Sequence, residues 1–216
     1  MINAIIAVIA AYFIGAIPSG LIIGKCYGKD IRKEGSCNTG ATNVTRCVGK
    51  KAGVFCFFCD FLKGAVPVLI ARFIAPGVPW AEIACFAVAV LGHMFPVYLK
   101  FKGGKGIATA AGGAFAIAPL PLLIALALWG LVFEISRYVS LASIVAAAAL
   151  PLSALVLRLA ADPVTAPWYL RVGTVTVIAF AVIGALAIFR HRSNIQRLLN
   201  GTESRFEKKK PQQSGE

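Results

Sequence analysis

Four polar stretches of this 216-residue chain combine the residue types that bind phosphate. Glycines let backbone N–H groups approach an anion closely, Lys and Arg supply positive charge, and Ser, Thr and Asn supply neutral donors. Together they indicate a site for phosphoryl groups. The stretches are GSCNTGATNVTR (35–46), FKGGKGIAT (101–109), EISRYVS (134–140) and HRSNIQRLLNGTE (191–203).

The glycine-rich stretch around Lys105 is not a nucleotide P-loop. In the pattern G-x-x-x-x-G-K-[ST], Leu99 stands where the first glycine is needed, and Gly106 replaces the hydroxyl residue that binds magnesium. ATP hydrolysis is therefore disfavoured. A simpler role for Lys105 and Arg46 is also open, because basic residues in short loops anchor and orient membrane proteins.

Other polar residues have both a structural and a functional interpretation. Asp60 and Lys63, three residues apart in an apolar run, suit either a structural ion pair or a functional site inside the membrane. His93 suits a hydrogen-bonded helix position, and His191 a solvated surface. Turn or cap formation is the simpler role for three residues of the first stretch, which are Asn38, Thr42 and Asn43.

The composition is that of a polytopic helical membrane protein. Hydrophobic residues make up 58% of the chain and charged residues 14%, and the mean hydropathy is +0.78. A soluble domain carries about 25% charged residues. The net charge of +13 lies largely in short loops between apolar runs, where orientation demands it, so no nucleic-acid partner is expected.

The apolar runs predict an all-α fold with seven transmembrane helices, two of them short. Pro119 and Pro121 divide the long stretch 107–133 into two pieces. With two crossings there, the basic tail after Arg190 lies in the cytosol and obeys the positive-inside rule, whereas one crossing would put it outside. The N-terminus is then external. The clear runs are 2–24, 54–75, 81–98, 139–157 and 172–189.

The cysteines and acidic residues indicate no metal or redox centre. CFFC at 56–59 lies in an apolar run without the βαβ pattern of a redox motif, so packing is the favoured role of these cysteines. We expect no metal and no cofactor. Residues 1–205 are predicted to form a single domain, and residues 206–216 a disordered basic tail.

Five ordered motifs resemble those of the bacterial acyl-phosphate glycerol-3-phosphate acyltransferases. The resemblance covers residues 35–203 and implies a seven-helix enzyme of the bacterial inner membrane, with its motifs on the cytosolic side. The family usually has a second glycine where this chain has Cys37. The motifs are GSCNTGATNVTR, DFLKGAVPV, LGHMFPVYLKFKGGKGIAT, SRYVSLASI and HRSNIQRLLNGTE.

The resemblance implies a reaction in which the primary hydroxyl of glycerol 3-phosphate attacks the carbonyl of a fatty acyl phosphate. The products are lysophosphatidate and phosphate, in the first acylation of phospholipid synthesis. An acyl phosphate has a good leaving group, so positioning and charge stabilisation suffice. The substrates, the bilayer and the soluble enzyme that makes acyl phosphate are the expected partners.

The residues of the motifs suit these roles. His191 or the oxygens of the acyl phosphate would accept the proton of the attacking hydroxyl, and both alternatives remain open. The catalytic set implied is Ser36, Arg46, Lys105, His191 and Asn194. Within the substrate-binding set, Asp60 and Glu203 would orient nearby basic groups. The set is Asn38, Gly40, Thr42, Asn43, Gly103, Gly104, Gly106, Asp60, Lys63 and Glu203.

Two rival functions fit the sequence less well. A small transporter or anion channel would place broken, charged helices near the membrane midplane within inverted repeats, whereas these motifs gather on one side and no repeat is visible. A CDP-alcohol phosphotransferase needs clustered aspartates for metal ions, and the nine acidic residues of this chain are scattered.

Overall fold

The computed structural model describes residues 1–161, 165, 167, 170 and 172–206, and within this part every regular element is a helix. Arg171 and the tail from residue 207 onward, both used in the topology prediction, lie outside the described residues. Phe206, which the sequence assigns to the tail, is held by a hydrogen bond from its amide to Arg137 O at 3.1 Å.

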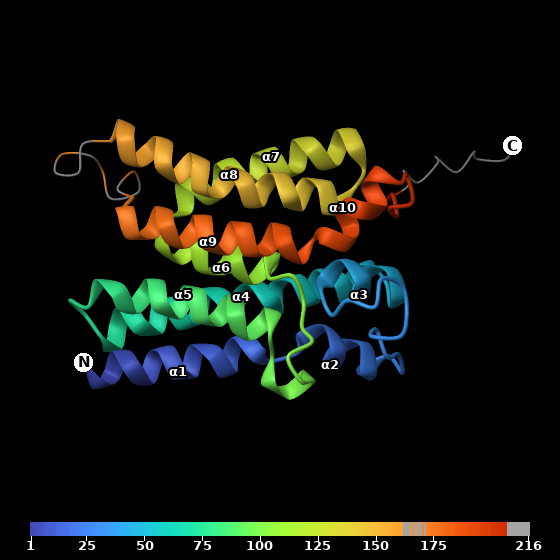
Figure 1. Ribbon diagram of the computed structural model, residues 1–216. Coiled ribbons are helices and arrows are strands. Elements are labelled where there is room, and N and C mark those ends of the chain that lie inside the picture. Colours follow the sequence, from blue (N-terminus) through green and yellow to red (C-terminus); the bar gives the residue numbers. More distant parts are fainter. Residues whose placement is uncertain (162–164, 166, 168–169, 171, 207–216) are drawn as a thin grey trace, which may run out of the picture.

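The long helices lie side by side in a bundle (Figure 1). In chain order, α1 packs against α4 and α5, α4 against α6, α7 against α8, and α8 against α9. The elements are α1 (Ile2–Ala16), α2 (Ser19–Cys26), α3 (Ala41–Cys47), α4 (Lys50–Ile74), α5 (Pro79–Met94), η1 (Val97–Leu99), α6 (Ile107–Ile117), α7 (Pro119–Ser136), α8 (Val139–Ala160), α9 (Thr174–Arg190) and α10 (Arg192–Leu199).

Prolines set two of the breaks in the bundle. The predicted run 2–24 forms two helices, α1 and α2, separated at Ile17 and Pro18. The stretch 107–133 divides as expected, because α6 ends at Ile117 and Pro119 begins α7, where its missing N–H costs nothing. Of the two short helices predicted for this stretch, α6 is short, but α7 has 18 residues.

The helices are long and apolar enough for a membrane. By length and composition, five spans qualify in the described part, and a sixth if α9 and α10, bent by 54° at their junction, count as one. The apolar helix α6 has 11 residues. Large apolar side chains face outward, as Phe73 and Leu159 do, while small ones such as Ala4 and Ala11 fill the interior.

A close helix crossing places α6 directly on α4. A Cβ atom added to Gly112 would lie 1.8 Å from Phe61 O, and one added to Gly64 would lie 1.9 Å from Thr109 O. Without Cβ atoms, the two backbones can touch, which is the way small residues bring membrane helices together. This crossing fixes α6 and therefore the glycine loop that leads into it.

The polar stretches gather toward one end of the bundle. Figure 1 shows α3, the turn between α7 and α8, and α10 at one end, with the N-terminus and the turn between α4 and α5 at the other. The loop between η1 and α6 reaches the end of α9, because Arg190 binds its carbonyls. Segments distant in sequence can therefore share one site.

Candidate active site

Lys105, in the loop before α6, is hydrogen-bonded to a network that is centred on Glu203 and joins α8 and α10. Its ammonium group donates to Asn194 Oδ1, and Asn194 Nδ2 donates to Glu203 Oε1 at 2.7 Å. The same carboxylate accepts from Ser140 Oγ and from Arg197 Nε, each at 2.7 Å. Because a carboxylate accepts only, these contacts fix the orientation of the Asn194 amide.

The charges around Lys105 are mostly positive. Burial lowers its pKa to about 8, Glu203 opposes this shift, and three arginines near it, Arg197, Arg46 and Arg190, add to it. Although burial opposes ionisation of Glu203, hydrogen bonds from its three donors hold the pKa of its carboxyl below the usual range. The surroundings of Lys105 thus hold one carboxylate and three arginines, an arrangement suited to an anion.

His191 lies beside this network, at the junction between α9 and α10. Its side chain is 3% exposed, and Nδ1 is 2.8 Å from Ala187 O. A carbonyl can only accept, so Nδ1 carries the hydrogen and the neutral ring keeps a lone pair on Nε2. This bond therefore leaves Nε2 as a proton acceptor. The solvated surface position is not observed.

The glycine loop is folded onto the end of α5. Gly103 N donates to Met94 O at 3.2 Å, and Gly104 N donates to His93 O at 3.1 Å. These two amides are therefore not free to bind an anion, which corrects the role that the sequence predicts for them. The need for glycine has another cause, because a Cβ atom on Gly104 would lie 2.1 Å from His93 Nε2.

The first polar stretch is shaped by the buried Asn43. Its Oδ1 accepts from Ser36 N at 2.8 Å, and its Nδ2 donates to Ile31 O at 2.8 Å. Asn38 Oδ1 accepts from Gly40 N at 2.9 Å, which forms a local turn before α3. The simpler roles suggested for Asn38 and Asn43 are therefore those observed, while the Ser36 side chain is exposed.

The stretch also carries a strained position and a basic end. Cys37, in place of the family glycine, has φ 56°, a left-handed conformation that disfavours side chains. Thr42 lies half-buried on α3. At the end of that helix, Arg46 Nη2 donates to Ser204 O at 3.4 Å and its guanidinium lies 5.5 Å from the centre of the Phe206 ring.

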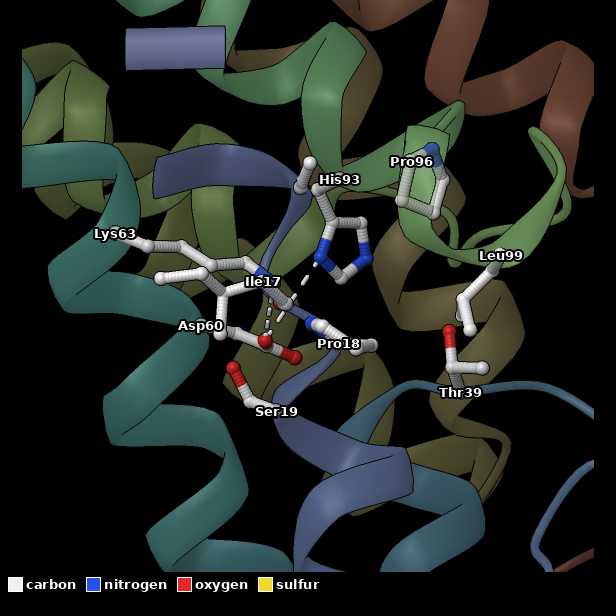
Figure 2. A pocket seen from close by; sticks show the side chains of 10 residues that line it. Ile17, Pro18, Ser19, Thr39, Asp60, Lys63, His93, Pro96 and Leu99 are labelled. Carbon is white, nitrogen blue, oxygen red and sulfur yellow. Dashed lines mark hydrogen bonds and ion pairs between the residues drawn. The ribbon is translucent and has the colours of Figure 1, made fainter. Parts of the chain in front are cut away.

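Asp60 and Lys63 belong to a second polar group beneath the glycine loop. Figure 2 shows them with His93 in a small pocket at the break between α1 and α2. Lys63 Nζ lies 2.8 Å from Asp60 Oδ1 and donates to Ile17 O at 2.8 Å. His93 Nδ1 is 3.8 Å from the same carboxylate oxygen. Asp60 and Lys63 therefore form the ion pair that their spacing suggested, and both line this pocket.

The structure therefore brings together most of the catalytic residues predicted from the sequence. Lys105 and Asn194 are in contact, His191 and Arg46 lie close to them, and Ser36 is held by the loop that ends at Arg46. Sequence reasoning missed three neighbours of this network. They are Ser140 and Arg197, which lie inside motifs without being singled out there, and Arg190, which counted only as a topological charge.

In the described part of the chain, apolar helices form a bundle with a cationic cluster toward one end, which is the architecture of a polytopic membrane protein. The chain belongs to the glycerol-3-phosphate acyltransferase family, whose model matches residues 5–201. The glycerol-3-phosphate acyltransferase of Aquifex aeolicus is 47% identical over 204 residues, 94% of this chain and 100% of that protein. The enzyme of Geobacter sulfurreducens is 45% identical over 206 residues, 95% of this chain and 99% of its own.

Solved structures show the same fold. A crystal structure of PlsY (YgiH), an integral membrane glycerol 3-phosphate acyltransferase, in its glycerol 3-phosphate form has a TM-score of 0.83 at 46% identity, and covers 94% of this chain and 96% of that one. The lysophosphatidic acid form has a TM-score of 0.81 at 45% identity, with 94% and 95% covered. The chain is therefore a multi-pass integral membrane protein of this family.

The packing of the glycine loop predicts a specific rescue. Gly104→Ala should lower kcat/KM at least about tenfold, because its methyl group would clash with the His93 ring and displace Lys105. In a His93→Ala background, the added methyl has room, so the same change should cost less than about threefold. Kinetics of the four proteins at equal membrane content test this. An undiminished loss in the double variant would mean that the glycine faces the substrate.

Proposed function

We propose that this protein transfers a fatty acyl group from acyl phosphate to the primary hydroxyl of glycerol 3-phosphate, and releases lysophosphatidate and phosphate. Membership of the glycerol-3-phosphate acyltransferase family supports acylation of glycerol 3-phosphate. The proposal goes beyond family membership because it names acyl phosphate as the donor. The observation that carries it is the excess of positive charge around Lys105.

Two phosphoryl groups must be bound at once in this reaction. Lys105 and Arg46 supply charge, and the neutral donors are Ser36, whose side chain is exposed, and Asn194, which contacts Lys105. Binding of dianionic phosphate offsets the mutual repulsion of Lys105 and the arginines near it. A thioester donor would bring no phosphate to the reacting carbonyl. The surplus charge is therefore best matched by a phosphate on the donor as well as on the acceptor.

The chemistry needs only positioning and stabilisation of charge. The acceptor oxygen forms a bond to the acyl carbon, negative charge develops on the carbonyl oxygen and then on the departing phosphate, and Lys105 stabilises it. The proton of the hydroxyl has two acceptors, His191 Nε2 and an oxygen of the acyl phosphate. The acyl chain enters laterally from the bilayer between helices, and its donor comes from a soluble acyl-phosphate-forming enzyme.

The other residues of the substrate-binding set act mainly by shaping the site. Asn38, Gly40 and Asn43 hold the loop that presents Ser36, and Thr42 lies on the short helix that leads to Arg46. The loop that carries Lys105 contains Gly103, Gly104 and Gly106. The break between α1 and α2 is supported by Asp60 and Lys63.

We further propose seven crossings, formed by α1 with α2, α4, α5, α6, α7, α8 and α9. The N-terminus is then outside, and the site faces the cytosol of a bacterial inner membrane. The positions of α3, α10 and the α7–α8 turn at one end of the bundle support this orientation (Figure 1). The positive-inside rule places that end in the cytosol.

The donor is tested directly with the purified protein. Palmitoyl phosphate and glycerol 3-phosphate should give lysophosphatidate, detected by mass spectrometry, and full activity should survive EDTA because the site is built from cations and neutral donors. Palmitoyl-CoA serves as the control donor and should be poor. An absolute requirement for a divalent metal, or equal use of palmitoyl-CoA, would contradict the proposed donor.

Lys105 is expected to act on the substrate as a cation. A charge-assisted hydrogen bond contributes roughly 1.5–3 kcal/mol, so Lys105→Ala should lower kcat/KM at least about tenfold. Arg46→Ala should behave similarly. Lys102→Ala, which removes the same charge from an exposed position of the loop, should have little effect. Normal kinetics in Lys105→Ala would show that this lysine is only a membrane anchor.

The pH profile provides a separate measurement of the same residue. The pKa of Lys105 lies at about 8, below the ordinary value of 10.5, so the ammonium form is lost as the pH rises through that value. The wild-type kcat/KM should fall correspondingly on the alkaline side. Lys105→Arg keeps its charge above pH 8 and should remove this alkaline limb, whatever its absolute activity. An unchanged limb would assign it to another group.

The topology is tested with a maleimide that does not cross membranes. In a background lacking Cys26 and Cys37, Pro76→Cys in the α4–α5 turn should be labelled in intact cells. Thr202→Cys should be labelled only after lysis, because five crossings separate the two positions. Restoring Cys37 alone, which is exposed in the first loop, gives a second position that should be labelled only after lysis. If positions 76 and 202 report the same side, the stretch of α6 and α7 does not cross twice.

A further inference from the structure

Arg190, the last residue of α9, binds the backbone of the glycine loop. Its Nη2 donates to Gly103 O at 2.8 Å and to Gly104 O at 3.0 Å, and its Nε donates to Gly104 O at 3.2 Å. The guanidinium also lies 5.3 Å from the centre of the Phe95 ring. A lysine has no such planar fork, so these paired contacts require arginine.

The same two glycines are held from the other side by α5. Their amides donate to Met94 O and His93 O, so the amide and the carbonyl of each glycine are bound within the protein. Glycine has more backbone freedom than any other residue, and two in succession would otherwise leave the loop poorly ordered. Two helix ends therefore fix the residues immediately before Lys105.

We propose that Arg190 is a positioning residue, which clamps Gly103 and Gly104 so that Lys105 stays in contact with Asn194 in the active site. Arg190 acts through the loop and does not bind the substrate. This inference rests on the proposed role of Lys105. Arg190 directly precedes His191 in the sequence, so the end of α9 holds both the glycine loop and His191 in place.

The alternative role for Arg190 is to anchor the helix end at the membrane surface, and the neighbouring Arg192 shows the contacts of such a residue. It is exposed, and its guanidinium lies 4.9 Å from the centre of the exposed Phe189 ring. Those are the contacts of a basic residue that anchors a helix end at a membrane surface. Arg190 and Arg192 carry the same charge at the same end of α9, so their variants separate positioning from anchoring.

The kinetic test uses Arg190→Ala, Arg190→Lys and Arg192→Ala, each in the wild-type and Lys105→Ala backgrounds. Arg190→Ala should lower kcat/KM about tenfold, Arg190→Lys should restore only part of the loss, and Arg192→Ala should match wild type. In the Lys105→Ala background, Arg190→Ala should cost less than about twofold, because the clamp acts through Lys105. Fully additive losses would show instead that Arg190 contacts the substrate and would overturn the proposal.

A second readout follows the ionisation of Lys105. The charged and titratable groups that face it are Glu203, Arg197, Arg46, Arg190 and His191. Removing Arg190 takes away a positive charge and loosens the loop, and both effects raise the pKa of Lys105. The alkaline limb of kcat/KM should therefore move to higher pH in Arg190→Ala and stay in place in Arg192→Ala. A limb that does not move in Arg190→Ala would contradict the clamp.

Hydrogen exchange tests the clamp without using activity. In Arg190→Ala, the amides of the segment 97–106 should exchange at least about tenfold faster than in Arg192→Ala, while α4 stays protected. Unchanged exchange in this segment would overturn the proposal, even if activity fell. Normal kinetics in Lys105→Ala together with faster exchange in Arg190→Ala would instead leave the clamp standing and refute the catalytic role of Lys105.

Discussion

The site depends on the hydrogen bonds that hold the short loop Gly103–Gly104 between the ends of two helices. Near the hydrocarbon layer, water cannot be relied upon to satisfy backbone polar groups, so the carbonyls at the end of α5 and those of the loop need partners in the protein. The glycine amides satisfy the first set and Arg190 the second. Lys105 follows directly and is directed at Asn194.

On the other side of the site, the network around Glu203 is likewise held by hydrogen bonds between separate segments. Its carboxylate is 7% exposed and binds groups from α8 and α10, which keeps Asn194 and Arg197 in place. A single buried carboxylate does not neutralise the arginines around Lys105. A phosphate-containing substrate would match the remaining positive charge. This charge depends on where the basic side chains are placed as much as on how many the chain contains.

Much of the fold was predictable from the sequence, since apolar runs, prolines and loop charges located the helices and the break at Pro119. Lys105, Asn194 and Glu203 were identified by their motifs. The contacts between distant segments were not predictable, because no local pattern indicates that Arg190 would bind glycine carbonyls. For the same reason, the glycines were assigned to substrate binding, although the His93 ring is what excludes a side chain at Gly104.

The segment after α10 has a consequence for the biogenesis of this protein. Glu203 and Ser204 bind residues from α8, α10 and α3, and the Phe206 amide binds Arg137 O. A nascent chain whose helices have already entered the membrane lacks these contacts until residues 203–206 leave the ribosome. The site is therefore completed after the bundle that carries it has been inserted.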